Sequence, residues 1–199
     1  MEPSVHTDYG RAYTEMVIHG LQERQIVRTM FSGRSMTPTL REGMQILLER
    51  AEPDQIEAAD IIMYRKADRA IVHRVVGIIR QNQNRLFVTK GDNHAYIGSD
   101  YIPESDLIGR VKGAFFESDP DTDVLVSNRF VGTLYILLAG LTSNTMRIRK
   151  RIPAPIRSIF KYFIGAFFFA FKKTIHAVYS GMSYGKLFFR KRARRTNSV

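Results

Sequence analysis

The sequence contains no cysteine among its 199 residues. This absence excludes disulfide bonds, thiolate catalysis and cysteine-ligated zinc. The chain has no internal repeat. Its first residues, MEPSVHTDYGRAYTEMVIH, contain neither a basic start nor an uninterrupted apolar run, so we expect no cleavable secretory signal. The hydrophobic content of 44% is enough for one folded domain with extensions.

Acidic residues are missing from the last part of the chain. Residues 1–123 carry 15 Lys+Arg and 19 Asp+Glu, whereas residues 124–199 carry 15 Lys+Arg and no acid. The change follows ESDPDTD (117–123), which has the composition of a turn. We therefore predict three parts: an N-terminal helical extension (1–24), a β domain (25–123) and a basic, aromatic-rich helical region (124–199).

Long apolar runs are also scarce, although the basic region has two shorter ones. Residues 130–146 are uncharged over 17 residues, while a membrane-spanning helix takes about 20. Residues 159–171 are rich in phenylalanine but include Lys161, which is typical of an amphipathic helix in the membrane interface. We predict association with the inner (cytoplasmic) membrane through residues 130–190. The side of the membrane that holds the β domain stays open.

Two other interpretations of the basic region are a helical hairpin packed on the β domain and a nucleic-acid-binding tail. Basic clusters with aromatic residues suit phosphates and stacked bases. The run FIGAFFFAF is too apolar for a phosphate backbone, so nucleic acid is the least favoured partner.

Short apolar segments dominate the β domain. Residues 11–23 have the apolar spacing of a short helix, and QIVRTMF after them is typical of a strand. Five further strands are predicted in MQILLER, DIIMYR, AIVHRVVGII, RLFVTK and LIGRVKGAFF, with turn residues between them. The gaps leave no room for crossover helices, so we expect a mainly β fold with an antiparallel sheet.

Candidate chemistry begins with Ser35, which lies in the glycine- and proline-containing turn FSGRSMTPTL. The turn alone fits either a nucleophile or an ordinary turn serine. A serine nucleophile needs a base and a group that orients the base. His73 in AIVHRVVG is the candidate base, and Asp92 and Asp100 in VTKGDNHAYIGSD are candidate orienting acids. His73, His94 and these aspartates lack any recognised metal-ligand spacing, so we expect no metal and no cofactor.

Five blocks over residues 25–115 carry a family resemblance: GRSMTPTL, DIIMYR, VHRVVG, VTKGDN and LIGRV. In this order and at these intervals the sequence resembles signal peptidase I-type serine peptidases, whose clan includes the self-cleaving SOS repressors. The resemblance implies a β-sheet catalytic domain in which Ser35 attacks a peptide carbonyl. One branch of the clan uses a lysine base, and another has histidine at that position. His73 places this sequence with the histidine branch.

The resemblance leaves two details open. In the histidine branch an aspartate shortly after the KGDN block completes the site, and Asp100 is the slightly favoured counterpart, with Asp92 shaping the turn. Many relatives have a serine at the position of Gly33, whose hydroxyl helps to stabilise the oxyanion. Here that role is expected to fall to backbone N–H groups, above all that of Ser35.

The resemblance implies a serine endopeptidase that cleaves a preprotein or a membrane-proximal peptide, with a protein or peptide as its substrate. The sequence departs from the family in one respect, because TEMVIHGLQERQIVRTMF (14–31) is not the apolar anchor that usually precedes the nucleophile. The alternative functions are an SOS-repressor-like self-cleaving regulator and an inactive, membrane-bound scaffold of the same fold.

Overall fold

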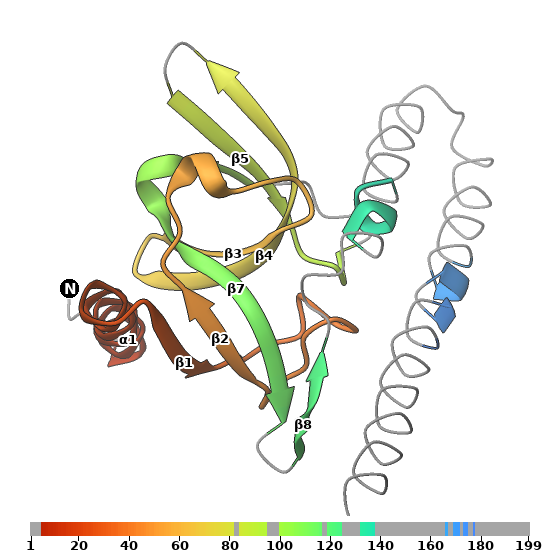
Figure 1. Ribbon diagram of the computed structural model, residues 1–199, viewed down its shortest axis with the longest axis horizontal. Helices are drawn as coiled ribbons and strands as arrows, with labels where there is room; N and C mark the ends of the chain where they lie inside the picture. The colour runs from red at the N-terminus through yellow and green to blue at the C-terminus, as the bar shows by residue number, and fades with distance from the viewer. Residues whose placement is uncertain are drawn as a thin grey trace, which may run out of the picture.

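The computed structural model describes residues 5–81, 84–94, 100–116, 119–124 and 132–137, together with 166, 169–171, 173, 174 and 177. One long helix, α1 (Val5–Glu23), precedes a coiled sheet (Figure 1). The predicted helix over residues 11–23 is confirmed, and it begins six residues earlier than expected.

The sheet has eight strands, and all of its pairs are antiparallel, as the short gaps predict. Seven strands follow the spatial order β1-β2-β7-β3-β4-β5-β6, and β8 pairs with β7. The strands are β1 (Ile26–Met30), β2 (Gln45–Glu49), β3 (Ile61–Lys66), β4 (Arg69–Gln81), β5 (Asn84–Lys90), β6 (Asp100–Pro103), β7 (Leu107–Phe116) and β8 (Asp119–Val124). Two single-turn 3-10 helices, η1 (Pro53–Gln55) and η2 (Glu104–Asp106), lie in the connections.

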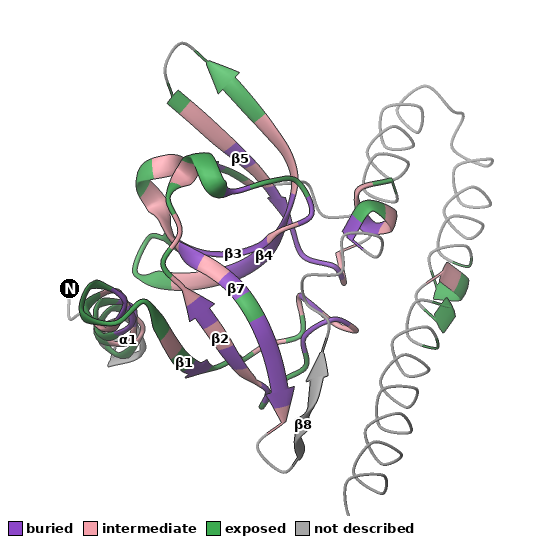
Figure 2. Ribbon diagram, viewed as in Figure 1, coloured by how far each residue is buried: buried purple, intermediate pink, exposed green. Residues whose placement is uncertain are grey.

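Alternation along the strands divides the buried residues into two apolar clusters, one on each face of the sheet. In β3, Ile61 and Met63 join the cluster that also holds Val17 and Leu21 of α1. Ile62 and Tyr64, the residues between and after them, belong to the second cluster. Both faces of β3 are therefore covered, which explains why its first four residues are apolar or aromatic without a break (Figure 2).

Helix α1 is held on the sheet by apolar packing and by one close backbone approach. Val17 and Leu21 are almost completely buried, and burying each side chain contributes about 1.5–3 kcal/mol. Near the start of the helix, a Cβ on Gly10 would lie 3.0 Å from the carbonyl oxygen of Asp68 in the β3–β4 turn. Glu15 adds a salt bridge to Arg65 at 3.1 Å. The helix thus packs directly against the β domain.

Two strands were not predicted from the sequence. The acidic segment ESDPDTD was expected to form a turn, but Asp119–Val124 is strand β8, and Phe116 pairs with Asp119. β8 lies at the edge of the sheet, where a proline and charged residues are tolerated. The other missed strand is β6, which has only four residues and ends at Pro103.

The predicted membrane-contacting segments lie mostly outside the described residues. Within residues 130–146, the described part is the helical segment 132–137, which packs on the β domain. A Cβ on Gly132 would lie 2.4 Å from the Cβ of Ala59, and Tyr135 is 4% exposed against Arg74. Among the described residues, no helix is both long and apolar enough to cross a membrane.

Candidate active site

Ser35 lies in the connection between β1 and β2, at the edge of a cavity. Gly33 has φ of +110°, in the region that favours glycine, so the turn requires this residue. The next buried side chains, Met36 and Leu40, are 0% exposed and fix the connection in the core. The turn is thus stiff on both sides of Ser35, which is itself only half-buried.

The turn after β5 binds the Ser35 segment through its backbone. The Asn93 N–H donates to the carbonyl oxygen of Ser35 at 2.7 Å, and the Asn93 side-chain amide donates to the carbonyl oxygen of Arg34 at 3.0 Å. Gly91 lies between the two segments, since a Cβ there would be 2.7 Å from the Ser35 carbonyl oxygen. The GDN sequence therefore positions the serine turn.

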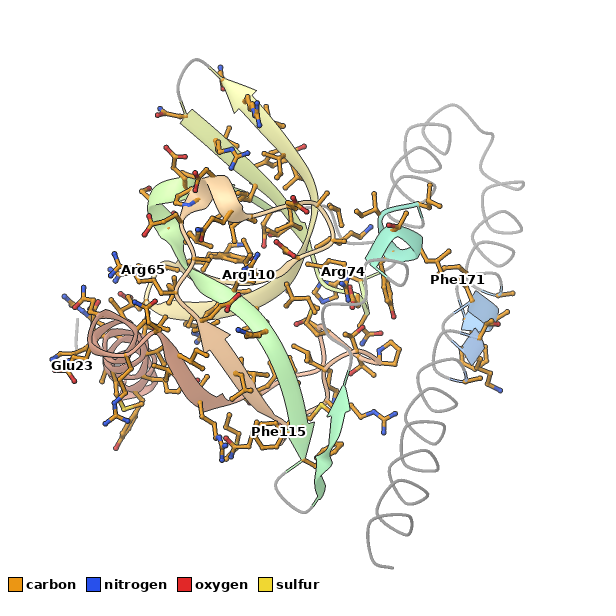
Figure 3. All side chains as sticks on the ribbon, viewed as in Figure 1. Glu23, Arg65, Arg74, Arg110, Phe115 and Phe171 are labelled. Carbon is orange, nitrogen blue, oxygen red and sulfur yellow. The ribbon has the colours of Figure 1, made fainter. Side chains whose placement is uncertain are left out.

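Asp92 forms a buried ion pair with Arg74. Both carboxylate oxygens accept hydrogen bonds from the guanidinium, at 2.9 Å from Nε and 2.8 Å from an Nη. Thr39 donates to the same carboxylate at 2.5 Å, and Arg74 also donates to the Ala59 carbonyl oxygen at 2.9 Å. Arg74 is 1% exposed and its guanidinium lies 5.0 Å from the ring of Tyr135. Figure 3 shows Arg74 beside the helical segment 132–137. Asp92 thus links β4, the turn after β5 and the serine connection.

His73 is buried in β4, and its two ring nitrogens face different groups. Nδ1 lies 3.1 Å from the Tyr64 hydroxyl and 4.0 Å from Oδ2 of Asp100. Nε2 lies on the side of Gly91, where a Cβ would be 3.2 Å from Nε2, 2.9 Å from His94 Nδ1 and 2.7 Å from the Ser35 carbonyl oxygen. The absence of a side chain at Gly91 therefore allows the histidine and the serine turn to approach each other.

Burial keeps His73 neutral. Loss of solvent is the largest influence, followed by the neighbouring His94, and together they lower the pKa of His73 to about 4. Asp100 and Asp92 act in the opposite direction but do not reverse the shift. The imidazole is therefore uncharged at neutral pH and has a nitrogen lone pair available as a base.

Asp100, the first residue of β6, is held by two donors. Lys66 Nζ donates to Oδ1 at 2.7 Å, and the Tyr64 hydroxyl donates to Oδ2 at 3.1 Å. Burial alone raises the pKa of Asp100, but these hydrogen bonds and the positive charge of Lys66 lower it overall. Asp100 is thus a carboxylate on the Nδ1 side of His73.

The cavity beside these residues has a volume of about 760 Å³. It extends from Ser35 and His73 to the first turns of α1. Its lining is Tyr9, Gly10, Tyr13, Met30, Phe31, Ser32, Ser35, Ile46, Met63, Lys66, Ala70, Ile71, Val72, His73, Thr89, Lys90, Gly91, His94 and Asp100. The lining surface is mainly apolar, and Lys66, His94 and Asp100 join His73 in it, so the cavity suits a largely apolar segment with a polar reacting group.

In the part of the chain that the structure describes, no three or more His, Cys, Asp or Glu side chains are grouped so that they could hold a metal ion.

Sequence reasoning missed Tyr64 as a member of the site. The register pairs Ile62 with His73, so Tyr64, two residues later in β3, lies on the same face of the sheet as His73. Thr89 pairs with Asp100 on that face as well. Counting residues outwards from the predicted turn between DIIMYR and AIVHRVVG pairs Tyr64 with Ile71, two residues before His73 and on the same face. That count is the signal in the sequence that could have identified Tyr64.

The fold and the site define a mainly antiparallel β protein in which a serine turn and a buried histidine meet at one cavity. No protein-family model matches the chain. Signal peptidase I W of Bacillus subtilis (strain 168) is 37% identical over 82 residues, which are 40% of this chain and 42% of that protein. The signal peptidase complex catalytic subunit SEC11C of Homo sapiens is 29% identical over 126 residues, which are 58% of this chain and 65% of that protein.

The chain therefore covers less than two thirds of the length of either relative. The same identity and coverage hold for SEC11C of Mus musculus. The matches establish a signal peptidase I-like relationship, at modest identity, and confirm the resemblance read from the five sequence blocks.

Proposed function

We propose that this protein is a serine endopeptidase that cleaves a preprotein or membrane-proximal peptide in the manner of signal peptidases. The observation that supports it most is the meeting at Gly91 of the Ser35 turn and His73 Nε2, with a carboxylate on the Nδ1 side of the ring. The relatives are named as signal peptidases, which favours the same activity here.

In the proposed reaction, the Ser35 hydroxyl oxygen attacks the peptide carbonyl carbon and its proton passes to His73 Nε2. The tetrahedral intermediate collapses, the C–N bond breaks, and the His73 proton passes to the leaving amine. Water, deprotonated by His73, then hydrolyses the acyl-enzyme and restores Ser35. Asp100 orients the ring and stabilises the imidazolium that forms in each step.

The oxyanion is assigned to backbone donors. Gly33 has no side chain to contribute, and open space surrounds the position that its Cβ would occupy. The proposed donor is the backbone N–H of Ser35, which belongs to the nucleophilic residue itself. Removing one oxyanion donor typically lowers kcat by about 10²–10³-fold. Asp92 is assigned a structural part in this scheme, since Arg74 and Thr39 bind its carboxylate.

For the remainder of the chain, we propose that residues 25–123 form the catalytic unit and that the basic region holds it at a membrane. The charge of residues 124–199 supports attraction to anionic lipid. The packing of Gly132 and Tyr135 on the β domain favours a membrane contact later in the sequence than residue 137. A chain ending at Val124, the last residue of β8, is expected to lose partition to vesicles of anionic lipid that the full chain retains.

The activity is tested by co-expressing the full chain with a secretory preprotein. Ser35→Ala and His73→Ala are expected to abolish processing. Ser105→Ala and His19→Ala are the matched controls, because Ser105 is an exposed residue of η2 and the His19 side chain is 69% exposed on α1. Processing that persists in Ser35→Ala would contradict the proposal, and cleavage of the chain itself, with the preprotein left intact, would favour the self-cleaving alternative.

A further inference from the structure

Tyr64 stands between the histidine and the aspartate of the proposed site. Its side chain is 0% exposed, and its hydroxyl lies 3.1 Å from both His73 Nδ1 and Asp100 Oδ2. The direct distance from Nδ1 to Oδ2 is 4.0 Å, which is too long for a hydrogen bond. Contact between the histidine and the aspartate therefore runs through the phenol.

The four residues involved come from four adjacent strands and share one face of the sheet. Ile62 pairs with His73, Val75 pairs with Thr89, and Thr89 pairs with Asp100. Because directly paired residues point to the same side, Tyr64, His73, Thr89 and Asp100 lie on the face of the sheet that carries the second apolar cluster, to which Tyr64 itself belongs. The position of the phenol is thus set by strand register.

Counting protons assigns the direction of each hydrogen bond. The phenol has one proton, and the ionised carboxylate of Asp100 can only accept, so the proton points to Asp100. The phenol oxygen then accepts from His73 Nδ1–H, and Thr89 donates to the same oxygen at 3.4 Å. With its proton on Nδ1, the neutral imidazole carries its lone pair on Nε2, the nitrogen on the side of Gly91.

We infer that Tyr64 is the positioning residue that transmits the charge of Asp100 to His73 and selects the imidazole tautomer with a basic Nε2. The inference rests on the proposed function and adds a fourth residue to the serine, histidine and aspartate. No proton passes through Tyr64, which keeps its own proton and stays uncharged. The Asp100 carboxylate polarises the phenol O–H bond, and the phenol oxygen thereby stabilises the imidazolium of His73.

The electrostatic surroundings support an uncharged phenol. Burial is the largest influence and raises the pKa of Tyr64 well above its usual range, and Asp100 raises it further. The charged or titratable groups that face His73 are His94 and Asp92 of the turn after β5, Asp100 of β6 and Lys66 of β3. Lys66 binds the other oxygen of Asp100 and leaves Oδ2 to the phenol.

The first test is Tyr64→Phe in the full chain, with Tyr101→Phe as the matched control. Tyr101 adjoins Asp100 in β6 but is 64% exposed. Cleavage of an internally quenched peptide with an A-x-A site is the assay. We expect kcat to fall by about 30–1000-fold in Tyr64→Phe with KM within about twofold, since a wrong tautomer costs up to about 10⁴ in a comparable triad. The control should retain the wild-type kcat.

The second test is the tautomer of His73, followed by ¹⁵N NMR of the imidazole at pH 7, which needs no substrate. The wild type is expected to carry the proton on Nδ1 and Tyr64→Phe to show a mixture. In Asp100→Ala the phenol is free to donate to Nδ1, so the proton should move to Nε2. Adding Tyr64→Phe to Asp100→Ala removes that donor, and the double variant should be no slower than Asp100→Ala alone.

Wild-type kcat in Tyr64→Phe, or a His73 tautomer that is unchanged in both single variants, would overturn the inference. Additive losses in the double variant would do the same. Ser35→Ala separates this failure from failure of the proposed function. If Ser35→Ala is inactive while Tyr64→Phe is fully active, only the role of Tyr64 is wrong. If Ser35→Ala remains active, the peptidase assignment itself is wrong.

Discussion

We expect Asp92→Ala to lower the free energy of unfolding much more than Asp100→Ala, because only Asp92 belongs to a buried ion pair. Asp92→Ala leaves the guanidinium of Arg74 in a site that is 1% exposed, with its main anionic partner removed. Breaking a buried pair in this way costs about 3–5 kcal/mol, and losing the bond from Thr39 adds about 1 kcal/mol. With an m-value of about 1–3 kcal/mol/M, the urea midpoint should fall by at least about 1 M.

Asp100→Ala is the matched comparison. The Asp100 side chain is 31% exposed and its partner Lys66 is 55% exposed, so solvent screens the pair and its loss should cost no more than about 1 kcal/mol. Urea unfolding followed by circular dichroism measures both variants, and peptide cleavage measures their activity. We expect Asp92→Ala to be the unstable variant and Asp100→Ala to be the stable but slow one. Equal urea midpoints for the two variants would refute the assignment of Asp92 to the buried pair.

Three further predictions concern the histidine and its surroundings. Because burial lowers the pKa of His73 to about 4 from about 6.5 in the unfolded chain, its contribution to stability is complete above pH 6.5 and is lost as pH falls to 4, on the order of 3 kcal/mol in total. His73→Gln should flatten that part of the stability curve, and a wild-type curve as flat as that of the variant would contradict the expected shift. The acid limb of kcat/KM should likewise have its midpoint near pH 4, and a midpoint at 6.5 would indicate a solvated histidine. Gly91→Ala should reduce kcat by about 100-fold, since its Cβ would press on the Ser35 carbonyl oxygen and on the rings of His94 and His73, whereas Gly77→Ala, whose Cβ meets Val88 at an ordinary 3.7 Å, should not.

Local sequence patterns predicted most of the sheet because each strand has its own alternation and turn residues. They could not predict β8, whose acidic, proline-containing sequence resembles a turn and becomes a strand only by pairing with β7. α1 continues towards the N-terminus beyond residue 11, and Gly10 lies there close to Asp68 of the β3–β4 turn. Tertiary contacts of this kind leave no mark in a local pattern.

The site shows the same division. Ser35, His73 and the two aspartates could be proposed from the sequence because their blocks are specific, and the open choice between Asp92 and Asp100 reflected their closeness in sequence. Tertiary structure separates them, because Asp92 points to Arg74 while Asp100 approaches His73 across β5. Tyr64 was missed because a tyrosine in a buried strand looks like a core residue, and only the register with β4 brings its hydroxyl to the histidine.

The most direct test of the central claim is the rate at which the purified full chain cleaves the quenched A-x-A peptide, compared with the rates of Ser35→Ala and His73→Ala. The mechanism predicts cleavage by the wild type and a loss of at least about 10³-fold in each variant, with unchanged urea midpoints for Ser35→Ala. A Ser35→Ala variant that cleaves within twofold of the wild-type rate would contradict it.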